Sequence, residues 1–314
     1  MNELCKILNI KYPIIQAGMV WCSGWELAAA SANSGILGVI GSGSMYPEIL
    51  DEHIRKCKKA TSKSFAVNVP LLYPQIEQHI EIILSHGVRT VITSAGNPAK
   101  YTPLLKKEGL TVIHVVSSSK FASKAVAAGV DAVVAEGFEA GGHNGREETT
   151  TMCLVPEVCN KVKVPVVAAG GIGSGKAMFA AMALGAAGVQ IGSRFVASSE
   201  SSAHPEFKKT VLSAEEGDTI LTLKELAPVR MIKNAFYQEI QQAYLKGCSA
   251  DELRQLLGRG RSKKGMFEGS LDEGELEIGQ VSASINKIQS VKEIVAEILE
   301  EYEATREKMS KEKI

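Results

Sequence analysis

The 314-residue sequence predicts an α/β protein built as a (β/α)8 TIM barrel. Eight short runs rich in β-branched apolar residues each end near Gly, Ser or Asn, and each is followed by a longer segment with helical character. The runs start 20 to 34 residues apart, which leaves room each time for a strand, a crossover helix and two loops. Strands that are apolar on both faces belong to parallel sheets, and eight units in roughly 180 residues favour a closed barrel.

The expected strands follow one another along the first two thirds of the chain. In order they are PIIQAG from Pro13, LGVIGSG from Leu37, SFAVNVPL from Ser64, TVITSAG from Thr90, TVIHVVS from Thr111, DAVVAEG from Asp131, PVVAAGG from Pro165 and GVQIGSR from Gly188. An open, doubly wound sheet is the alternative fold. The first glycine-rich turn, GSGSMY at Gly41, lacks the GxGxxG spacing that such a dinucleotide-binding sheet carries.

Three domains or segments are expected from this pattern. Residues 1–197 form the barrel core, and residues 198–290 form a helical insertion that lies as a lid over the C-terminal mouth of the barrel. Amphipathic stretches such as APVRMIKNAFYQEIQQAYL, from Ala227, predict the helices of this insertion. Residues 291–314 form a C-terminal helix that frays into solvent, because its apolar positions give way to solid charge.

Composition excludes several classes of protein. Thirty-five basic and thirty-five acidic side chains give a formal net charge of zero, which argues against a surface tuned for nucleic acid or anionic lipid. No apolar run reaches the roughly 20 residues of a membrane span. No secretory signal is recognisable and no two cysteines stand at CxxC spacing, so we expect reduced thiols and a cytoplasmic protein. The cysteines are Cys5, Cys22, Cys57, Cys153, Cys159 and Cys248.

Two glycine turns predict a phosphate site at the barrel mouth. The segments AAGGIGSGKA from Ala168 and IGSRF from Ile191 follow the seventh and eighth strands, whose loops are adjacent in a barrel. Backbone N–H groups there, helped by a helix N-terminus after Gly175, would bind an anion. The residues expected to do so are Gly170, Gly171, Gly192 and Ser193. The alternative is that these glycines only make tight turns.

The loop after the sixth strand carries the candidate acid or base. It begins AEGFEAGGHNGREETTTM. There His143 follows Gly141 and Gly142 and precedes Asn144 and Gly145, so neighbouring side chains cover little of its imidazole. Histidine exchanges protons near neutral pH, although a surface or capping role is the alternative. Glu136 and Glu139 on the same loop could orient the imidazole or cap the loop.

Polar residues at two other strand ends could bind the edge of a heterocycle. These are Asn68, after the third strand, and Ser94, near the end of the fourth, although either alone could be a turn or capping residue. His114 lies inside the fifth strand and is expected in the core or the barrel lining. The histidines show no HxH or HExxH spacing, so no metal site is expected.

Several segments together resemble the flavin-dependent nitronate monooxygenase and enoyl-[acyl carrier protein] reductase II superfamily. They are YPIIQAGM, AEGFEAGGHNG, PVVAAGGI, VQIGSRF and the IGQ at Ile278, and they span nearly the whole chain. Three further segments, NVPLLYP from Asn68, SSAHPEFK from Ser201 and VRMIKN from Val229, look closer to the reductase branch.

The resemblance implies an FMN cofactor and a catalytic role for His143. The FMN phosphate would lie on the two glycine turns, the isoalloxazine near Gly18, Met19 and Asn68, and a late glycine–glutamine element at Gln280 close by. The residues expected around the flavin are Gly18, Met19, Asn68, Ser94, Glu136, Gly142, Gly170, Gly171, Gly192, Ser193 and Gln280.

The reaction implied is reduction of a trans-2-enoyl thioester on acyl carrier protein in fatty-acid synthesis. NADH or NADPH would be the reductant, flavin N5 would pass the hydride, and His143 would donate or relay the proton. A homodimer and a monovalent cation requirement are also expected possibilities.

Other functions compete with the reductase. In a nitronate monooxygenase, His143 would instead act as a base on a nitroalkane or nitronate, and reduced flavin would meet oxygen. A purine nucleotide dehydrogenase needs a cysteine nucleophile after strand six, where Cys153 is the only candidate and is expected to be a buried thiol. A non-enzymatic flavin-binding protein is a further alternative.

The basic segment 254–264, RQLLGRGRSKK, has two interpretations. It is most simply a solvated loop. The alternative is contact with an acidic acyl carrier protein or a nucleotide phosphate.

Overall fold

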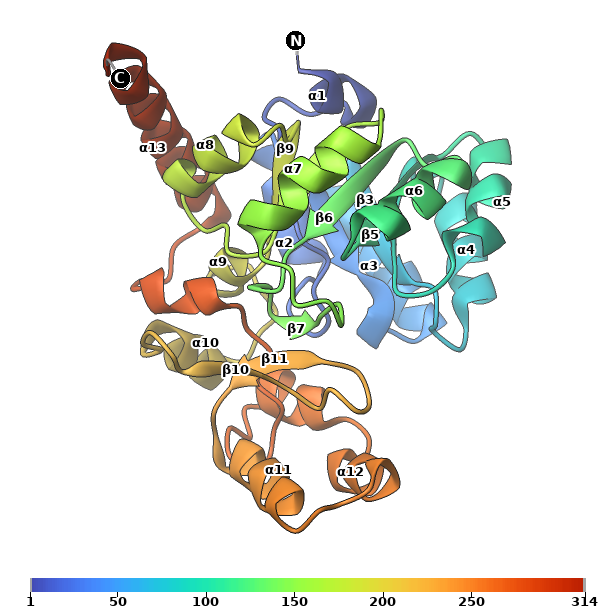
Figure 1. Cartoon of the computed structure of the whole chain (residues 1–314). Coiled ribbons are helices and arrows are strands. Elements are labelled where there is room, and N and C mark those ends of the chain that lie inside the picture. Colours follow the sequence, from blue (N-terminus) through green and yellow to red (C-terminus); the bar gives the residue numbers. More distant parts are fainter. Residues whose placement is uncertain (1, 313–314) are drawn as a thin grey trace.

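The computed structural model describes residues 2–312, and its core is a closed eight-stranded parallel barrel surrounded by helices (Figure 1). The strands pair in the order β1-β9-β8-β6-β5-β4-β3-β2, and a parallel bridge between Ile15 and Leu37 joins the first strand to the second. Each of the eight apolar runs contains one strand, so the predicted (β/α)8 barrel is confirmed. The strands are β1 (Ile14–Gln16), β2 (Gly38–Gly41), β3 (Phe65–Pro70), β4 (Thr90–Ser94), β5 (Thr111–Val116), β6 (Ala132–Glu136), β8 (Val166–Ala169) and β9 (Gly188–Ile191).

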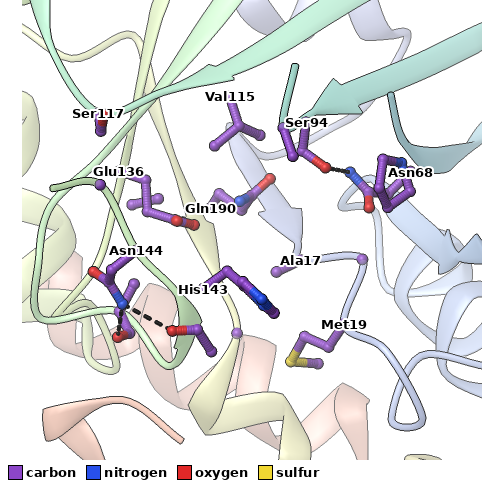
Figure 2. Close-up of a pocket in the computed structure, with 18 of the residues that line it drawn as sticks. Ala17, Met19, Asn68, Ser94, Val115, Ser117, Glu136, His143, Asn144 and Gln190 are labelled. Carbon is purple, nitrogen blue, oxygen red and sulfur yellow. Dashed lines mark hydrogen bonds between the residues drawn. The ribbon is translucent and has the colours of Figure 1, made fainter. Parts of the chain in front are cut away.

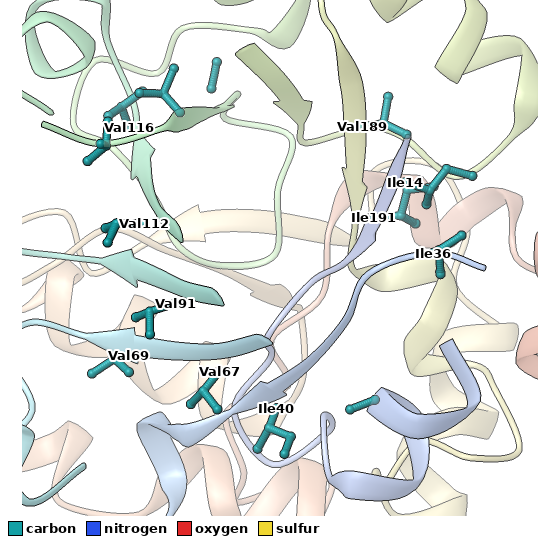
Figure 3. Close-up of a cluster of buried hydrophobic side chains, with 14 of the residues drawn as sticks. Ile14, Ile36, Ile40, Val67, Val69, Val91, Val112, Val116, Val189 and Ile191 are labelled. Carbon is teal, nitrogen blue, oxygen red and sulfur yellow. The ribbon is translucent and has the colours of Figure 1, made fainter. Parts of the chain in front are cut away.

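The outer face of the barrel is covered by helices that follow the strands. They are α2 (Trp25–Asn33), α3 (Pro47–Ala60), α4 (Ile76–Ser85), α5 (Thr102–Lys107), α6 (Ser119–Ala127), α7 (Thr151–Lys161), α8 (Gly175–Ala183) and α13 (Val291–Lys311). Branched side chains on the outer face of the strands, such as Val67, Val91 and Val112, form the main core against these helices (Figure 3). β-Branched residues suit this position because they pack well on a pleated surface.

Small and branched residues from the other face of the strands fill the barrel interior. Ala66, Ile113 and Val134 belong to this second cluster. Helix α1 (Glu3–Leu8) supplies Leu4 and Leu8 to the same cluster, so its apolar side closes the N-terminal end of the barrel. The opposite end, where the strands finish, is left for the site.

The insertion after the eighth strand is not purely helical. It contains α9 (Ser193–Val196), α10 (Pro205–Leu212), α11 (Ala235–Leu245) and α12 (Ala250–Leu257), the π-helical turn η3 (Lys263–Phe267) and the 3-10 turn η4 (Gln280–Ser284). It also contains the antiparallel strands β10 (Thr219–Thr222) and β11 (Val229–Ile232). Strand β11 pairs in turn with β7 (Gly142–His143) of the loop after β6.

The expectation of one amphipathic helical stretch from Ala227 is therefore wrong over its first half. Val229 and Met231 are buried and the strand has ladder partners on both sides, so tertiary pairing prevails over the helical spacing of its apolar residues. Only the second half of that stretch forms a helix, α11. The insertion lies beyond the end of the barrel where the strands finish (Figure 1).

The C-terminal helix α13 is part of the barrel's outer layer. Its apolar residues Val291, Ile294, Val295 and Ile298 are buried, and its main neighbours are α8 and α2. A capping box between Ser290 and Glu293 begins the helix. The expected fraying is not observed up to Lys311, and residues 313–314 lie outside the described part of the chain.

None of the helices within residues 2–312 combines the length and the apolar character that a membrane crossing requires.

Candidate functional site

A cavity of about 1290 Å³ opens at the end of the barrel where the strands finish. Its walls come from the segments after β1, β3, β4, β5, β6, β8 and β9, and the insertion supplies Ala227, Met266, Glu277, Ile278 and Val281. This is the end at which barrel enzymes carry their active sites. Figure 2 shows side chains from these separate elements converging on one space.

The two predicted phosphate loops face the cavity together. Gly170 and Gly171 have φ angles of 91° and 69°, a left-handed conformation that other residues adopt with strain. A Cβ added at Gly170 would lie 2.6 Å from the carbonyl oxygen of Gly137, so the turn also requires the missing side chain. Gly192 and Ser193 line the cavity from the neighbouring strand end. Because the glycines at 170, 171 and 192 have no side chains, a phosphate could approach the backbone N–H groups of these turns closely.

The helix N-terminus expected to assist these loops is occupied by a protein group. The amide of Gly175 donates to Glu301 Oε2 of α13 at 2.8 Å, and Ser174 Oγ caps the amide of Ala177. Gly175 also lies outside the cavity lining. The α8 N-terminus therefore does not face the cavity, which corrects the expectation that it assists the two glycine loops.

The residues expected near a flavin ring, Gly18, Met19 and Asn68, also line the cavity. Gly18 packs so tightly against β3 that an added Cβ would lie 2.4 Å from Asn68 Cβ. Asn68 Nδ2 donates to the carbonyl of Ile92 at 3.1 Å and to Ser94 Oγ at 3.4 Å. Its backbone carbonyl accepts from Ser42 Oγ at 2.7 Å, whereas its side-chain Oδ1 accepts from no residue between 2 and 312 and could accept from a ligand. Met19 completes this wall (Figure 2).

His143 projects into the cavity from strand β7 (Figure 2). Its backbone pairs with Val229 of β11, so the insertion fixes the position of the loop that carries it. The side chain of Asn144 donates to the carbonyls of Ala140 and Gly142 and braces the same turn. The imidazole is exposed and lines the cavity, so a ligand bound there could contact it.

The two glutamates of the same loop have different roles. Glu139 accepts from the amide and the hydroxyl of Thr151 at 3.0 Å, so it ties the loop to the start of α7 and does not orient the imidazole. Glu136 stands at the end of β6 and lines the cavity. Burial raises the pKa of its carboxyl to about 7, which places a titrating group on the cavity wall.

Sequence reasoning missed several polar residues of the cavity wall, among them Gln190 and Glu277. Gln190, 7% exposed, comes from the inner face of β9, and Glu277 comes from the end of the insertion. The signal for Gln190 in the sequence is a polar residue inside the apolar run GVQIGSR. The alternation of acidic and apolar residues in GELEIGQ could have found Glu277, because it indicates an extended segment with one polar face.

His114 lines the cavity, as expected for a residue of the barrel lining. Its Nδ1 lies 2.7 Å from the hydroxyl of Thr93, and burial lowers its pKa to about 4. The ring is therefore neutral at physiological pH.

Gln280 is separated from the other predicted site residues. It is exposed and absent from the cavity lining. Its backbone N–H donates to the backbone carbonyl of Glu139 at 3.0 Å. Its neighbours Ile278 and Val281 reach the cavity instead.

Two further expectations from the sequence concern residues that lie outside the cavity. Cys153 is exposed near the start of α7, so the expectation of a buried thiol is wrong; its side chain lies outside the cavity lining. Most charges of the basic segment 254–264 are paired locally: Arg254 with Asp251, Lys263 with Glu268 and Lys264 with Glu273. This pairing favours the interpretation of the segment as a solvated loop.

Across residues 2–312 no three His, Cys, Asp or Glu side chains are grouped so that they could hold a metal ion.

The fold and the site define a (β/α)8 barrel protein with a ligand cavity at the strand ends, and comparison with known proteins identifies its family. The family model described as nitronate monooxygenase matches residues 1–78 and 74–301. The chain therefore belongs to the nitronate monooxygenase family, and it is an oxidoreductase of that family.

Individual relatives point in more than one direction within this family. The solved structure of FabK from Thermotoga maritima is 40% identical, with a TM-score of 0.93 over 99% of this chain and 98% of the other. A (3aS,4S,5R,7aS)-5-hydroxy-7a-methyl-1-oxo-octahydro-1H-indene-4-carboxyl-CoA dehydrogenase of Mycobacterium tuberculosis is 29% identical over 95% of both chains. A probable nitronate monooxygenase of Staphylococcus haemolyticus is 34% identical over 77% of this chain and 80% of the relative.

Proposed function

We propose that this protein is an FMN-dependent enoyl-[acyl carrier protein] reductase that uses NADH or NADPH. The observation that carries the proposal is the similarity to FabK, the enoyl-[acyl carrier protein] reductase II, at 40% identity over essentially the whole of both chains. A second relative has a carboxyl-CoA compound in its name, so a thioester-linked ligand also occurs elsewhere among the relatives.

The cavity fits an FMN group. The bare glycine turns at Gly170–Gly171 and Gly192–Ser193 suit its phosphate, and Asn68 offers an acceptor to the edge of a flat ring. The volume of about 1290 Å³ exceeds the roughly 300–1,000 Å³ of a typical ligand pocket, which leaves room for a second ligand beside the cofactor.

The protein's own groups supply binding and proton transfer. When bound, FMN supplies the hydride chemistry that no side chain can provide. His143 would donate or relay the proton that reaches the α-carbon of the enoyl thioester, and would polarise its carbonyl. The apolar walls around Met19, Ile172 and Val196 would exclude water from the reacting carbons.

A nitronate monooxygenase is the second candidate, and the observation that favours it is the set of relatives with that name at 32–34% identity. In that reaction His143 would act as a base on the carbon acid of a nitroalkane or nitronate. The same exposed imidazole serves both functions, so the geometry at His143 alone does not choose between them.

Anaerobic half-reactions distinguish the two candidates. The flavin-loaded protein is mixed with NADH and, separately, with NADPH, and its visible absorbance is followed before and after addition of crotonyl thioester. The reductase predicts bleaching by one of the nucleotides and recovery of the absorbance with the thioester. Bleaching by an alkyl nitronate, with no response to either nucleotide, would contradict the reductase and favour the monooxygenase.

A further inference from the structure

The cavity extends beyond the residues expected around a flavin and reaches helix α6. Past His114 its wall continues along the end of β5 to Phe121 and Lys124 of α6. The facing wall comes from the loops after β3 and β4, at residues 72–74 and 95–99. We call this part of the cavity the α6 branch. None of the residues expected around the flavin belongs to these segments, so the branch is available to a second ligand.

The walls of the α6 branch are apolar and fixed in place. Two buried alanines hold the inner side of α6 against the core, and Phe121 is left 41% exposed. On the facing wall Leu72 is 76% exposed. The two loops of that wall pack on each other, since a Cβ added at Gly96 would lie 3.0 Å from Leu71 Cβ. Large apolar side chains that stay exposed beside a cavity favour an apolar ligand there.

Lys124 makes this branch the positive end of the cavity. Among residues 2–312 it is the one lysine or arginine that lines the cavity. Its Nζ lies 5.7 Å from the centroid of the Phe121 ring and forms no ion pair or hydrogen bond with the described part of the chain. The three glutamates of the lining come from β6, the loop after it and the insertion. An anionic group on a ligand is therefore attracted to the α6 end.

This cation stands apart from the turns expected to hold an FMN phosphate. Those turns follow β8 and β9, whereas α6 follows β5, and β6 lies between β5 and β8 in the barrel. An FMN phosphate at Gly170–Gly171 thus leaves Lys124 unused. An unpaired cation at the end of an apolar branch suits a ligand that carries a phosphate at some distance from its reacting part.

The polar side chains along the branch are engaged within the protein. Ser117 Oγ donates to Glu147 Oε2 at 3.1 Å, and the Tyr73 hydroxyl donates to the carbonyl of Met45 at 2.7 Å. Asn97 Oδ1 accepts from a backbone amide of its own loop at 3.1 Å. Few side-chain partners remain for the ribose hydroxyls and the adenine of a dinucleotide, whose burial without hydrogen bonds is costly. A largely apolar chain that ends in a phosphate fits these walls better.

We propose that the α6 branch binds the phosphopantetheine arm of the carrier-bound thioester, with Lys124 on its phosphate. The proposal deepens the proposed function, on which it rests, by naming how the carrier end of the substrate is held. The arm is a flexible chain with methylene groups and a geminal dimethyl group, and its far end carries the phosphate. Its apolar groups pack between Phe121 and Leu72, and the thioester end reaches the inner cavity that His143 lines.

Two small substrates that differ only in the phosphate test the branch. They are crotonyl-phosphopantetheine and crotonyl-pantetheine, and the flavin-loaded protein reduces each with NADH or NADPH at saturation. Wild type is compared with Lys124→Met, which removes the charge and keeps an apolar stem. Lys120→Met is the matched control, because Lys120 is exposed about one turn earlier on α6 and lies outside the cavity lining.

We expect wild type to reduce the phosphorylated substrate with a kcat/KM about threefold to tenfold higher, as for one partly exposed charge-assisted contact. The difference should lie in KM and should shrink as salt is added. Lys124→Met should abolish the preference and Lys120→Met should retain it.

Two results would overturn the proposal. One is a phosphate preference that survives Lys124→Met. The other is a rise in KM for NADH or NADPH in Lys124→Met with the constants for both thioesters unchanged, which would assign the branch to the nucleotide.

A binding measurement separates the branch from the reductase. Butyryl-phosphopantetheine and butyryl-pantetheine, which have no double bond to reduce, are titrated into the oxidised flavoprotein by calorimetry. Tighter binding of the phosphorylated ligand that depends on Lys124, in a protein that reduces no thioester, would retain the branch and refute the reductase. Thioester reduction with no preference for the phosphate would leave the reductase standing and overturn the branch, and so would equal binding of the two ligands or none.

Discussion

Gly18 marks the tightest approach between two walls of the cavity. In Gly18→Ala the new methyl group would lie 2.4 Å from Asn68 Cβ and 3.0 Å from Val39 Cγ1, so β3 or the loop after β1 must move. We expect the free energy of unfolding to fall by about 1–3 kcal/mol and FMN affinity to fall with it. Urea unfolding and flavin titration measure the two effects.

Gly217→Ala is the control for that change. Gly217 has a φ of 87° with no atom within 4 Å of an added Cβ, so the substitution introduces strain in the insertion without overlap. It should cost stability and leave FMN affinity intact. Equal FMN affinity in Gly18→Ala and wild type would show that the Gly18–Asn68 contact does not shape the cofactor site.

His114 should make the protein less stable in mild acid. Burial lowers its pKa from 6.5 to about 4, so the unfolded chain binds the proton more readily than the folded chain. The stability contributed is complete above pH 6.5 and is lost as the pH falls toward 4. Between about pH 7.5 and about pH 5, wild type should lose about 2 kcal/mol more than His114→Asn. Parallel urea unfolding curves for the two proteins would contradict this.

Individual site residues differ in how well the sequence reveals them. The place of Gly170 and Gly192 at the cavity was predictable because they end the last two strands of the barrel, while their part in binding a phosphate stays a prediction. Glu277 was not, because its place beside His143 depends on a bridge to Met231 that no local pattern encodes. The α8 N-terminus was misjudged for a similar reason: Glu301, far along the chain, reaches it first.

Among the elements of the fold, strand β11 holds the loop that carries His143 in place through Arg230. This side chain is 2% exposed, donates from Nε to the carbonyl of Phe138 at 3.1 Å, and lies over the Phe138 ring. Arg230→Met removes the bond while keeping an apolar stem. We expect a loss of about 1.5–3 kcal/mol in unfolding free energy and faster amide exchange in residues 137–145.

Lys233→Met is the matched control, since this lysine follows the same strand but is exposed and bonds only to the carbonyl of Gly217 through its side chain. Lys233→Met should leave amide exchange in residues 137–145 unchanged. If Arg230→Met also leaves that exchange unchanged, β11 does not fix the loop.

The eight barrel strands were predictable because each is a complete local signal, a β-branched apolar run ended by a turn residue. β11 was not, because VRMI is too short to establish a period and merges with the helical pattern of α11. Its strand conformation comes from partners at β10 and β7 that are distant in sequence.

For the whole molecule, α13 completes the barrel. Each of its buried residues Val291, Ile294, Val295 and Ile298 contributes about 1.5–3 kcal/mol, which together rivals the roughly 5–15 kcal/mol of net stability that a domain has. A chain ending at Ser290 should therefore fail to bind flavin, and one ending at Thr305 should bind it with a similar Tm. Flavin retention by the shorter chain would show that α13 is dispensable.

We propose above that this cavity binds and reduces enoyl thioesters and that His143 delivers the proton. The most direct measurement is isotope tracing: crotonyl thioester is turned over with NADH or NADPH in D2O, and the product is analysed by mass spectrometry and NMR. We expect a saturated butyryl thioester with one solvent deuteron at the α-carbon, formed at least about 100-fold more slowly by His143→Asn. Absence of saturated thioester from the wild-type protein with both nucleotides, alongside oxidation of an alkyl nitronate, would contradict it.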